Sequence, residues 1–342
     1  MEHHIEERYI SLLTDFGFKR IFGSKPNKDL LINFLNSLFK EEQVITDVKY
    51  LNSEHAGDVY TDRKAIFDVY CENENGEKFI VEMQNAYQKY FKDRSLYYAT
   101  FPIKEQAPKS ADWDFKLSHV YVVALLNFDM KDEAFDTKSI AHDVGLLDKK
   151  TKKVFNDKLT FKYIEIAKFD KPLSKLHTTY DKWLFALKNL SRLENRPKEL
   201  RDKIFDKLFE EAEIAKFSKK ELHEYEDSLK AYRDIKNSLN TAFEKGHEKG
   251  RDERSFEIAS ALLTEGISIE KIMHCTGLTE EQIKGLSNGK KITWYKNAKQ
   301  IYRKYGAKEV LRTLSFNYVL LHKKDIKMYQ VIFLLLLNYK SS

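Results

Sequence analysis

A run of twelve residues at positions 117–128 constrains the fold more than any other part of the chain. Its sequence is Leu-Ser-His-Val-Tyr-Val-Val-Ala-Leu-Leu-Asn-Phe, in which apolar residues follow one another almost without alternation. This pattern is typical of a strand that is covered on both faces, because a strand with one face in water alternates apolar and polar residues. We therefore expect residues 117–128 to form the central strand of a sheet.

The segments around this strand have the patterns of helices and of further strands. Apolar residues between Phe16 and Phe39 recur at three- and four-residue steps around a Ser-Lys-Pro-Asn break, which predicts a short helix followed by a longer one. A helix is also predicted over 89–104, and a strand over 159–167. Runs of β-branched and aromatic residues predict three more strands, at 44–51, 64–71 and 78–84. This order predicts an α/β domain with a mixed sheet.

Acidic side chains lie on two strands that are predicted to pair. The runs 64–71 and 78–84 are joined by Glu-Asn-Glu-Asn-Gly-Glu, whose Asn-Gly pair is a strong hairpin signal. Glu82 and Gln84 share one face of the second strand because side chains alternate with a period of two. The hairpin brings that face beside Asp68, which is flanked by apolar residues on the first strand.

Two interpretations of the acidic pair stay open on spacing alone. A buried carboxylate is costly unless it is paired or bound to a cation. Asp68 and Glu82 are then ligands of Mg²⁺ or Mn²⁺, which prefer oxygen donors. Alternatively, the two acids form cross-strand ion pairs with Arg63, Lys64 or Lys78.

The second half of the chain has a helical pattern rich in Lys and Glu from about residue 178. We predict an α/β domain over 1–175 that is followed by an all-helical region. The all-helical region consists of a helical part at 176–243 and a charged helix with a small helical hairpin at 244–289. A basic tail follows at 290–342.

The small hairpin resembles a helix-turn-helix. Ser268 and Thr279 are predicted N-caps, and Thr279 with Gln282 matches a capping box. Its second helix starts with Glu280 and Glu281, which disfavours contact with DNA phosphates. The hairpin therefore either binds DNA or forms a packing or homo-oligomer contact.

The charge of the chain is concentrated at its C-terminal end. The net charge is +6, but residues 290–342 hold twelve basic residues against two acidic ones, so the rest of the chain is negative. This tail is either an appended or frame-shifted segment or a basic arm that binds DNA phosphates. Composition alone does not argue for DNA.

Several classes of protein are disfavoured by the sequence. Cys71 and Cys275 are the only cysteines, which excludes a disulfide scaffold and a structural zinc site and favours a reducing cytoplasm. The acidic N-terminus lacks the pattern of a signal peptide. The most apolar run, at 331–337, is too short to span a bilayer, so we expect no membrane partner.

Five motifs in order resemble one known family. They are Thr-Asp-Phe-Gly-Phe-Lys-Arg-Ile-Phe-Gly at 14–23, Asp-Leu-Leu-Ile-Asn-Phe-Leu-Asn at 29–36, Phe-Asp-Val at 67–69, Val-Glu-Met-Gln at 81–84 and Asp-Arg-Ser-Leu-Tyr-Tyr at 93–98. Together they resemble the Rpn family of recombination-promoting nucleases and transposases, a branch of the PD-(D/E)xK superfamily with a restriction-endonuclease-like core. The resemblance covers roughly residues 8 to 290. It implies a bacterial, metal-dependent DNA endonuclease associated with recombination or mobile elements.

The resemblance also implies roles for particular residues. Asp68 and Glu82 would bind the metal, and Gln84 completes the catalytic set where lysine is usual in the superfamily. An amide can orient a water molecule but cannot stabilise hydroxide as an ammonium group would. The alternative is therefore a weak or inactive nuclease fold that binds DNA or protein.

Three further residues are supporting candidates. Lys19 and Asp15 match the opening motif, and Lys19 either reaches a phosphate, replaces the missing lysine, or only forms a salt bridge on the helix surface. Arg94 is a candidate contact to the DNA backbone.

Overall fold

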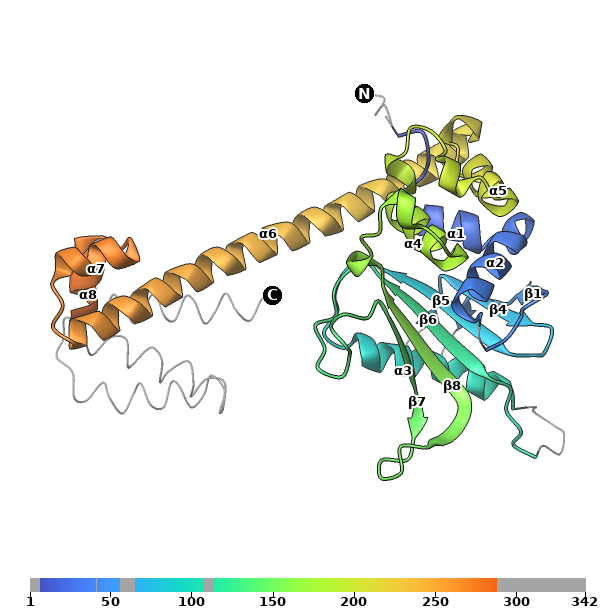
Figure 1. Ribbon diagram of the computed structural model, residues 1–342, viewed down its shortest axis with the longest axis horizontal. Helices are drawn as coiled ribbons and strands as arrows, with labels where there is room; N and C mark the ends of the chain where they lie inside the picture. The colour runs from blue at the N-terminus through green and yellow to red at the C-terminus, as the bar shows by residue number, and fades with distance from the viewer. Residues whose placement is uncertain (1–6, 41, 56–64, 108–113, 288–342) are drawn as a thin grey trace. The chain divides into compact units, whose positions relative to one another are not determined.

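The computed structural model describes residues 7–40, 42–55, 65–107 and 114–287 (Figure 1). The chain divides into two compact units, with the boundary after Thr241. The predicted basic tail at 290–342, including its apolar run, lies outside the described residues. Within the described part of the chain, no helix combines the length and the apolar character needed to cross a membrane.

The elements follow one another in the order expected of a mixed α/β fold. The α-helices are α1 (Asp15–Phe22), α2 (Lys28–Leu38), α3 (Phe91–Glu105), α4 (Thr179–Asn189), α5 (Lys203–Glu211), α6 (Lys219–Thr264), α7 (Ile269–Thr276) and α8 (Glu280–Ser287). The strands are β1 (Val48–Tyr50), β2 (Glu54–His55), β3 (Ala65–Ile66), β4 (Val69–Asn73), β5 (Lys78–Gln84), β6 (Val120–Leu126), β7 (Ala141–Leu147) and β8 (Val154–Glu165). Short 3-10 helices are η1 (Lys25–Asn27), η2 (Ile166–Lys168), η3 (Leu173–Lys175), η4 (Leu190–Arg192), η5 (Lys198–Leu200) and η6 (Ile214–Lys216).

Six strands form one mixed sheet in the order β1-β4-β5-β6-β8-β7. The pairs β5–β6 and β6–β8 are parallel, and the other neighbours are antiparallel. All seven residues of β6 are buried. The expected central strand and the mixed α/β fold are therefore confirmed.

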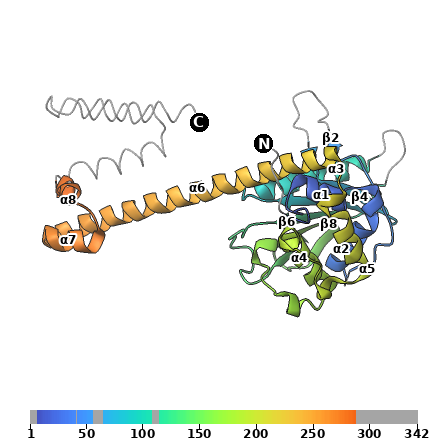
Figure 2. The ribbon, with the colours of Figure 1, turned by 90° about the horizontal axis from the view of Figure 1, so that it is seen from above.

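Helices cover both faces of the sheet, which explains the continuous burial of β6. Figure 2 shows α3 on one side of the strands and α2 and α4 on the other. Alternate residues of β5 contribute to the two cores: Phe79 and Val81 pack with α1, α2 and α4, whereas Ile80 packs with Phe91 and Ala99 of α3. The face of β5 that carries Ile80 is therefore also the face that carries Glu82 and Gln84.

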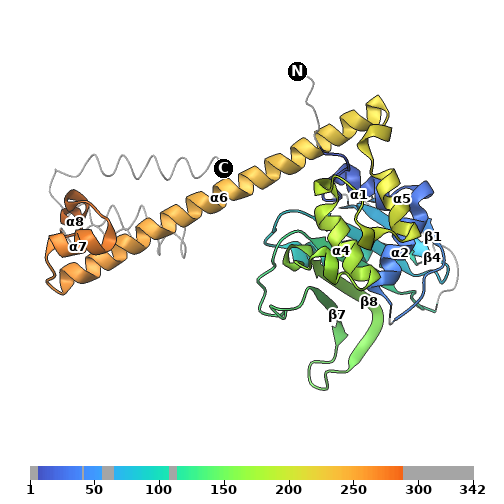
Figure 3. The same ribbon diagram turned by 45° about the horizontal axis from the view of Figure 1, so that its top comes forward.

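Helices α4 and α5 and the first part of α6 share the first of these cores with the sheet. Trp183 of α4 lies 5.4 Å from Phe22 and 5.0 Å from Phe205, measured between ring centroids. Figures 1 and 3 show α4 and α5 beside α2. The boundary drawn after residue 175 stays a prediction, but it does not separate two hydrophobic cores.

The strands differ from the sequence predictions in several places. The run 64–71 is not one strand, because β3 and β4 are interrupted at Phe67 and Asp68. The run 44–51 pairs only over Val48–Tyr50. Strand β7 was not expected, because its residues are exposed or half-buried at the edge of the sheet and lack an apolar alternation.

The C-terminal helices form a small core of their own around Ala259, Ile272, Leu278 and Ile283. The predicted capping box at the start of α8 is confirmed: Thr279 Oγ1 accepts from Gln282 N at 3.3 Å, and Gln282 Oε1 accepts from Thr279 N at 2.8 Å. Ser268 is the N-cap of α7, although its side chain makes no capping hydrogen bond.

Candidate functional site

The candidate site lies where the hydrogen-bonded ladder between β4 and β5 ends. The last paired residues are Val69 and Val81, so Asp68 and Glu82 are the next residues across the two strands. Asp68 N donates to Glu82 Oε1 at 3.2 Å, and Met83 N donates to Asp68 Oδ2 at 2.8 Å. Each carboxylate thus takes a backbone N–H that is released where the strands separate, which fixes both side chains in place.

Burial gives the two acids unusual electrostatics. Glu82 is 5% exposed, and Asp68 is half-buried. Burial, together with the charge of Asp68, raises the pKa of Glu82 from its ordinary value to about 8. Burial also raises the pKa of Asp68, against the effect of the N–H of Met83. Without a nearby cation, the doubly ionised form of the pair is therefore disfavoured at neutral pH.

Gln84 joins this pair as the sequence predicts. Its side chain is half-buried, and its Nε2 donates to Glu82 Oε2 at 3.4 Å. The contact is long for an N–H···O hydrogen bond, so the amide is only weakly held there. The structure therefore brings Asp68, Glu82 and Gln84 together.

Helix α1 carries Asp15 in its first turn and Lys19 in its last turn. Thr14 caps the helix by accepting from Gly17 N at 3.1 Å. A Cβ atom at Gly17 would lie 2.2 Å from Ser11 O, so only glycine fits this approach of the preceding loop. The tight junction sets the position of the first turn of α1.

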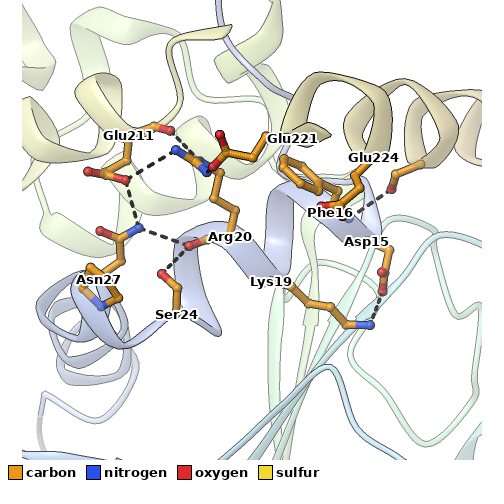
Figure 4. A pocket seen from close by; sticks show the side chains of 11 residues that line it. Asp15, Phe16, Lys19, Arg20, Ser24, Asn27, Glu211, Glu221 and Glu224 are labelled. Atoms are coloured by element: carbon orange, nitrogen blue, oxygen red, sulfur yellow. Dashed lines mark hydrogen bonds and ion pairs between the residues drawn. The ribbon is translucent and has the colours of Figure 1, made fainter. Parts of the chain in front are cut away.

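Lys19 forms a salt bridge and also acts on the acidic pair. Its Nζ lies 2.7 Å from Asp15 Oδ1, one helical turn away (Figure 4). Its positive charge favours the ionised forms of Asp68 and Glu82, and it opposes the effect of burial on the pKa of both groups. The predicted surface salt bridge therefore exists. The same ammonium group also lowers the pKa values of Asp68 and Glu82 through its charge.

Arg94 approaches the same acids from α3. Its Nη1 donates to Gln88 Oε1 at 2.6 Å, and its guanidinium lies 5.1 Å from the ring centroid of Phe91. Its charge also favours ionised Asp68 and Glu82, in addition to that of Lys19. Two cations, from α1 and from α3, thus act on one carboxylate pair.

Lys78 does not form the alternative ion pair with Asp68 or Glu82. Its Nζ lies 2.6 Å from Glu72 Oε2, so this lysine pairs with a different acid. Arg63 and Lys64 lie outside the described residues.

Tyr98 also lies beside the site, where no role was predicted for it from the sequence. Its ring packs 5.1 Å from that of Phe67. Burial, and next the charge of Glu82, raise the pKa of the Tyr98 hydroxyl, which places this group near the acids. The available signal was its position four residues after Arg94, because residues at this spacing share a helix face.

The donor set fits a hard divalent cation. Across the described part of the chain, no group of three or more His, Cys, Asp or Glu side chains is arranged to hold a metal ion. Asp68 and Glu82 nevertheless each have one oxygen fixed by a backbone N–H. The second oxygen of Asp68, and that of Glu82 with its long contact to Gln84, are the donors for another ligand. A divalent cation would offset both the burial and the repulsion by Asp68 that raise the pKa of Glu82. Two carboxylates are sufficient for Mg²⁺ or Mn²⁺, which keep several water ligands.

A pocket of about 720 Å³ runs along α1 beside Asp15 and Lys19 (Figure 4). Its other wall carries Glu211, Glu221 and Glu224. Acidic side chains repel phosphate, so this pocket is not where we expect a nucleic acid to bind. The carboxylate pair at the end of the β4–β5 ladder remains the candidate site.

Family models match both units of the chain. Residues 12–242 match the PD-(D/E)XK nuclease family transposase, a range that includes every candidate site residue. Residues 252–288 match the C-terminal HTH domain of the Rpn/YhgA-like nuclease family, which corresponds to the end of α6 with α7 and α8. No curated protein and no solved structure matches the chain. With its first unit and its C-terminal hairpin both matched, the chain belongs to the Rpn-like PD-(D/E)XK nuclease family of transposase-like proteins.

Proposed function

We propose that the chain is a DNA endonuclease that depends on a divalent metal ion and hydrolyses phosphodiester bonds, in recombination or in the movement of mobile elements. The observation that carries this proposal is the buried pair of Asp68 and Glu82 at the end of the β4–β5 ladder. The match to a nuclease family supports hydrolysis of phosphodiester bonds as the reaction.

Asp68 and Glu82 would hold Mg²⁺ or Mn²⁺. When bound, such an ion polarises the scissile phosphate and lowers the pKa of a water molecule. The backbone N–H groups of Asp68 and Met83 keep the carboxylates oriented without reorganisation. Gln84 orients the attacking water through its amide, which is weakly held and therefore available.

Lys19 provides the positive charge that Gln84 lacks. It comes from α1 rather than from β5, and its charge acts on both carboxylates. In this role it stabilises negative charge that develops on the reacting phosphate. Arg94 provides a second cation on the α3 side and contacts the DNA backbone.

The C-terminal HTH domain binds the DNA substrate in this proposal. The family match supports this role. The second helix of the hairpin begins with acidic residues, and Glu280 is partly neutralised by Lys284 at 2.6 Å. The same helices are the expected site of any homo-oligomer contact.

Cleavage of supercoiled plasmid tests the proposal. The full chain is incubated with plasmid in Mg²⁺, in Mn²⁺ or in EDTA, beside Asp68→Ala and beside Asp234→Ala, an exposed acid on α6. We expect nicked or linear DNA only with a divalent ion, loss of cleavage in Asp68→Ala and wild-type cleavage in Asp234→Ala. DNA binding without metal-dependent cleavage would instead favour the inactive binding module.

A further inference from the structure

A chain of polar contacts connects the strand that carries Gln84 to the helix that carries Lys19. Asn85 directly follows Gln84, and its Nδ2 donates to Leu13 O at 2.6 Å. Leu13 directly precedes Thr14, the N-cap of α1. One side chain therefore joins the end of β5 to the start of α1.

Asn127 holds the other side of Asn85. Its Nδ2 donates to Asn85 Oδ1 at 3.2 Å, and its backbone N donates to Gln84 O at 2.8 Å. Asn127 directly follows β6, the most buried strand of the sheet. Asn127, at the end of a buried strand, therefore holds both the backbone of Gln84 and the side chain of Asn85 in place.

Helix α6 makes hydrogen bonds to the same region, at the start of α1 and at Asn127. Tyr225 OH accepts from Ser11 N at 3.0 Å, and Ser228 Oγ accepts from Phe16 N at 3.0 Å. The hydroxyl of Tyr232 lies 3.5 Å from Asn127 Nδ2. These three α6 residues are spaced by three and four positions, so they lie on one face of the helix. The loop before α1 is consequently held on one side by Asn85 and on the other by α6.

We propose that Asn85 is a positioning residue, which sets the place of Lys19 relative to the carboxylate pair through its contact with Leu13. This inference rests on the proposed nuclease function. A shift of α1 by about 1 Å moves the ammonium group away from the developing charge, and displacements of this size cost about a hundredfold in rate. Asn85 needs no contact with substrate for this effect.

The test compares Asn85→Ala with a matched control, Asn36→Ala. Asn36 on α2 is also half-buried and makes two side-chain hydrogen bonds, both to Ile45, at 2.8 and 2.7 Å, but it carries no connection to the site. We expect kcat for DNA cleavage to fall ten- to a hundredfold in Asn85→Ala with an unchanged KM, and to stay within twofold in Asn36→Ala.

A double mutant establishes whether Asn85 acts through Lys19. In a Lys19→Ala background, Asn85→Ala should lower kcat by less than threefold, because there is no ammonium group left to misplace. An unchanged kcat in the single mutant, or the full loss in the double mutant, would overturn the inference. If Asn85→Ala does not fold, Asn85→Leu keeps the volume of the side chain and removes the donor to Leu13, with the same expected kinetics.

Amide hydrogen exchange gives a readout that does not need cleavage. We expect faster exchange over residues 14–20 in Asn85→Ala than in wild type, and no change there in Asn36→Ala. Wild-type protein that does not cut DNA would refute the nuclease proposal alone, and unchanged exchange over residues 14–20 would refute the positioning role alone.

Discussion

The protonation state of Glu82 links the candidate site to the stability of the folded protein. Its carboxyl group is buried beside that of Asp68, and its pKa of about 8 means that the metal-free protein carries a proton there at neutral pH. The group titrates near its ordinary pKa of 4.5 in the unfolded chain. Its burial therefore costs stability once the pH is high enough to ionise the group in the unfolded chain.

Glu82→Gln should stabilise the metal-free protein at alkaline pH. The pKa of Glu82 is higher in the folded state than in the unfolded state, so the folded protein loses stability as the pH rises from about 4.5 toward 8. Glutamine removes this loss, on the order of 4 kcal/mol at pH 8 and little at pH 4. Thermal denaturation in EDTA at both pH values measures it, with the exposed Glu133→Gln as control. A lower melting temperature for Glu82→Gln at pH 8 would contradict this account.

Gln84 allows a direct test of how the missing lysine is replaced. Gln84→Leu should slow cleavage roughly ten- to a hundredfold, because a lost hydrogen bond costs about 1 to 3 kcal/mol and each 1.4 kcal/mol is about tenfold in rate. Gln84→Lys should be slow if Lys19 already supplies the charge, and Lys19→Ala should then rescue it. Steady-state cleavage rates of the three variants decide the matter. Wild-type rates in Gln84→Leu would show that residue 84 only packs.

Among the elements, α1 depends on a close contact at its first turn. Gly17→Ala places a Cβ atom against Ser11 O, so we expect a loss of about 1 to 3 kcal/mol in the free energy of unfolding. Gly246→Ala is the matched control, because Gly246 lies in α6 with no atom near its Cβ position, and it should gain up to about 1 kcal/mol. Urea denaturation compares the two. Equal effects would mean that helix propensity, not the contact, governs position 17.

The elements also show which features can be predicted from sequence. The strand at β6 and the shared face of Glu82 and Gln84 follow from local patterns with periods that the backbone imposes. The break at Asp68 does not, because it depends on the backbone N–H of Met83 across the hairpin. The roles of Asn85 and Asn127 are equally hidden, since their partners lie far away in sequence.

For the whole molecule, the division near residue 241 predicts separable properties. A chain that ends at residue 241 keeps the core around Trp183, so its thermal transition should change by less than about 5 °C. It should bind DNA more weakly, because it lacks the HTH match at 252–288. Tryptophan fluorescence during heating and electrophoretic mobility shift measure these two properties. A collapse of the transition would show that the first unit needs the second.

The reciprocal contacts of Asp68 and Glu82 make the site observable without any substrate. The amide protons of Asp68 and Met83 each point at a carboxylate oxygen of the pair. Their NMR chemical shifts should therefore follow the charge on these oxygens, whether it changes through a proton or through a metal ion. Two backbone signals would report the state of the candidate site without any assay of cleavage.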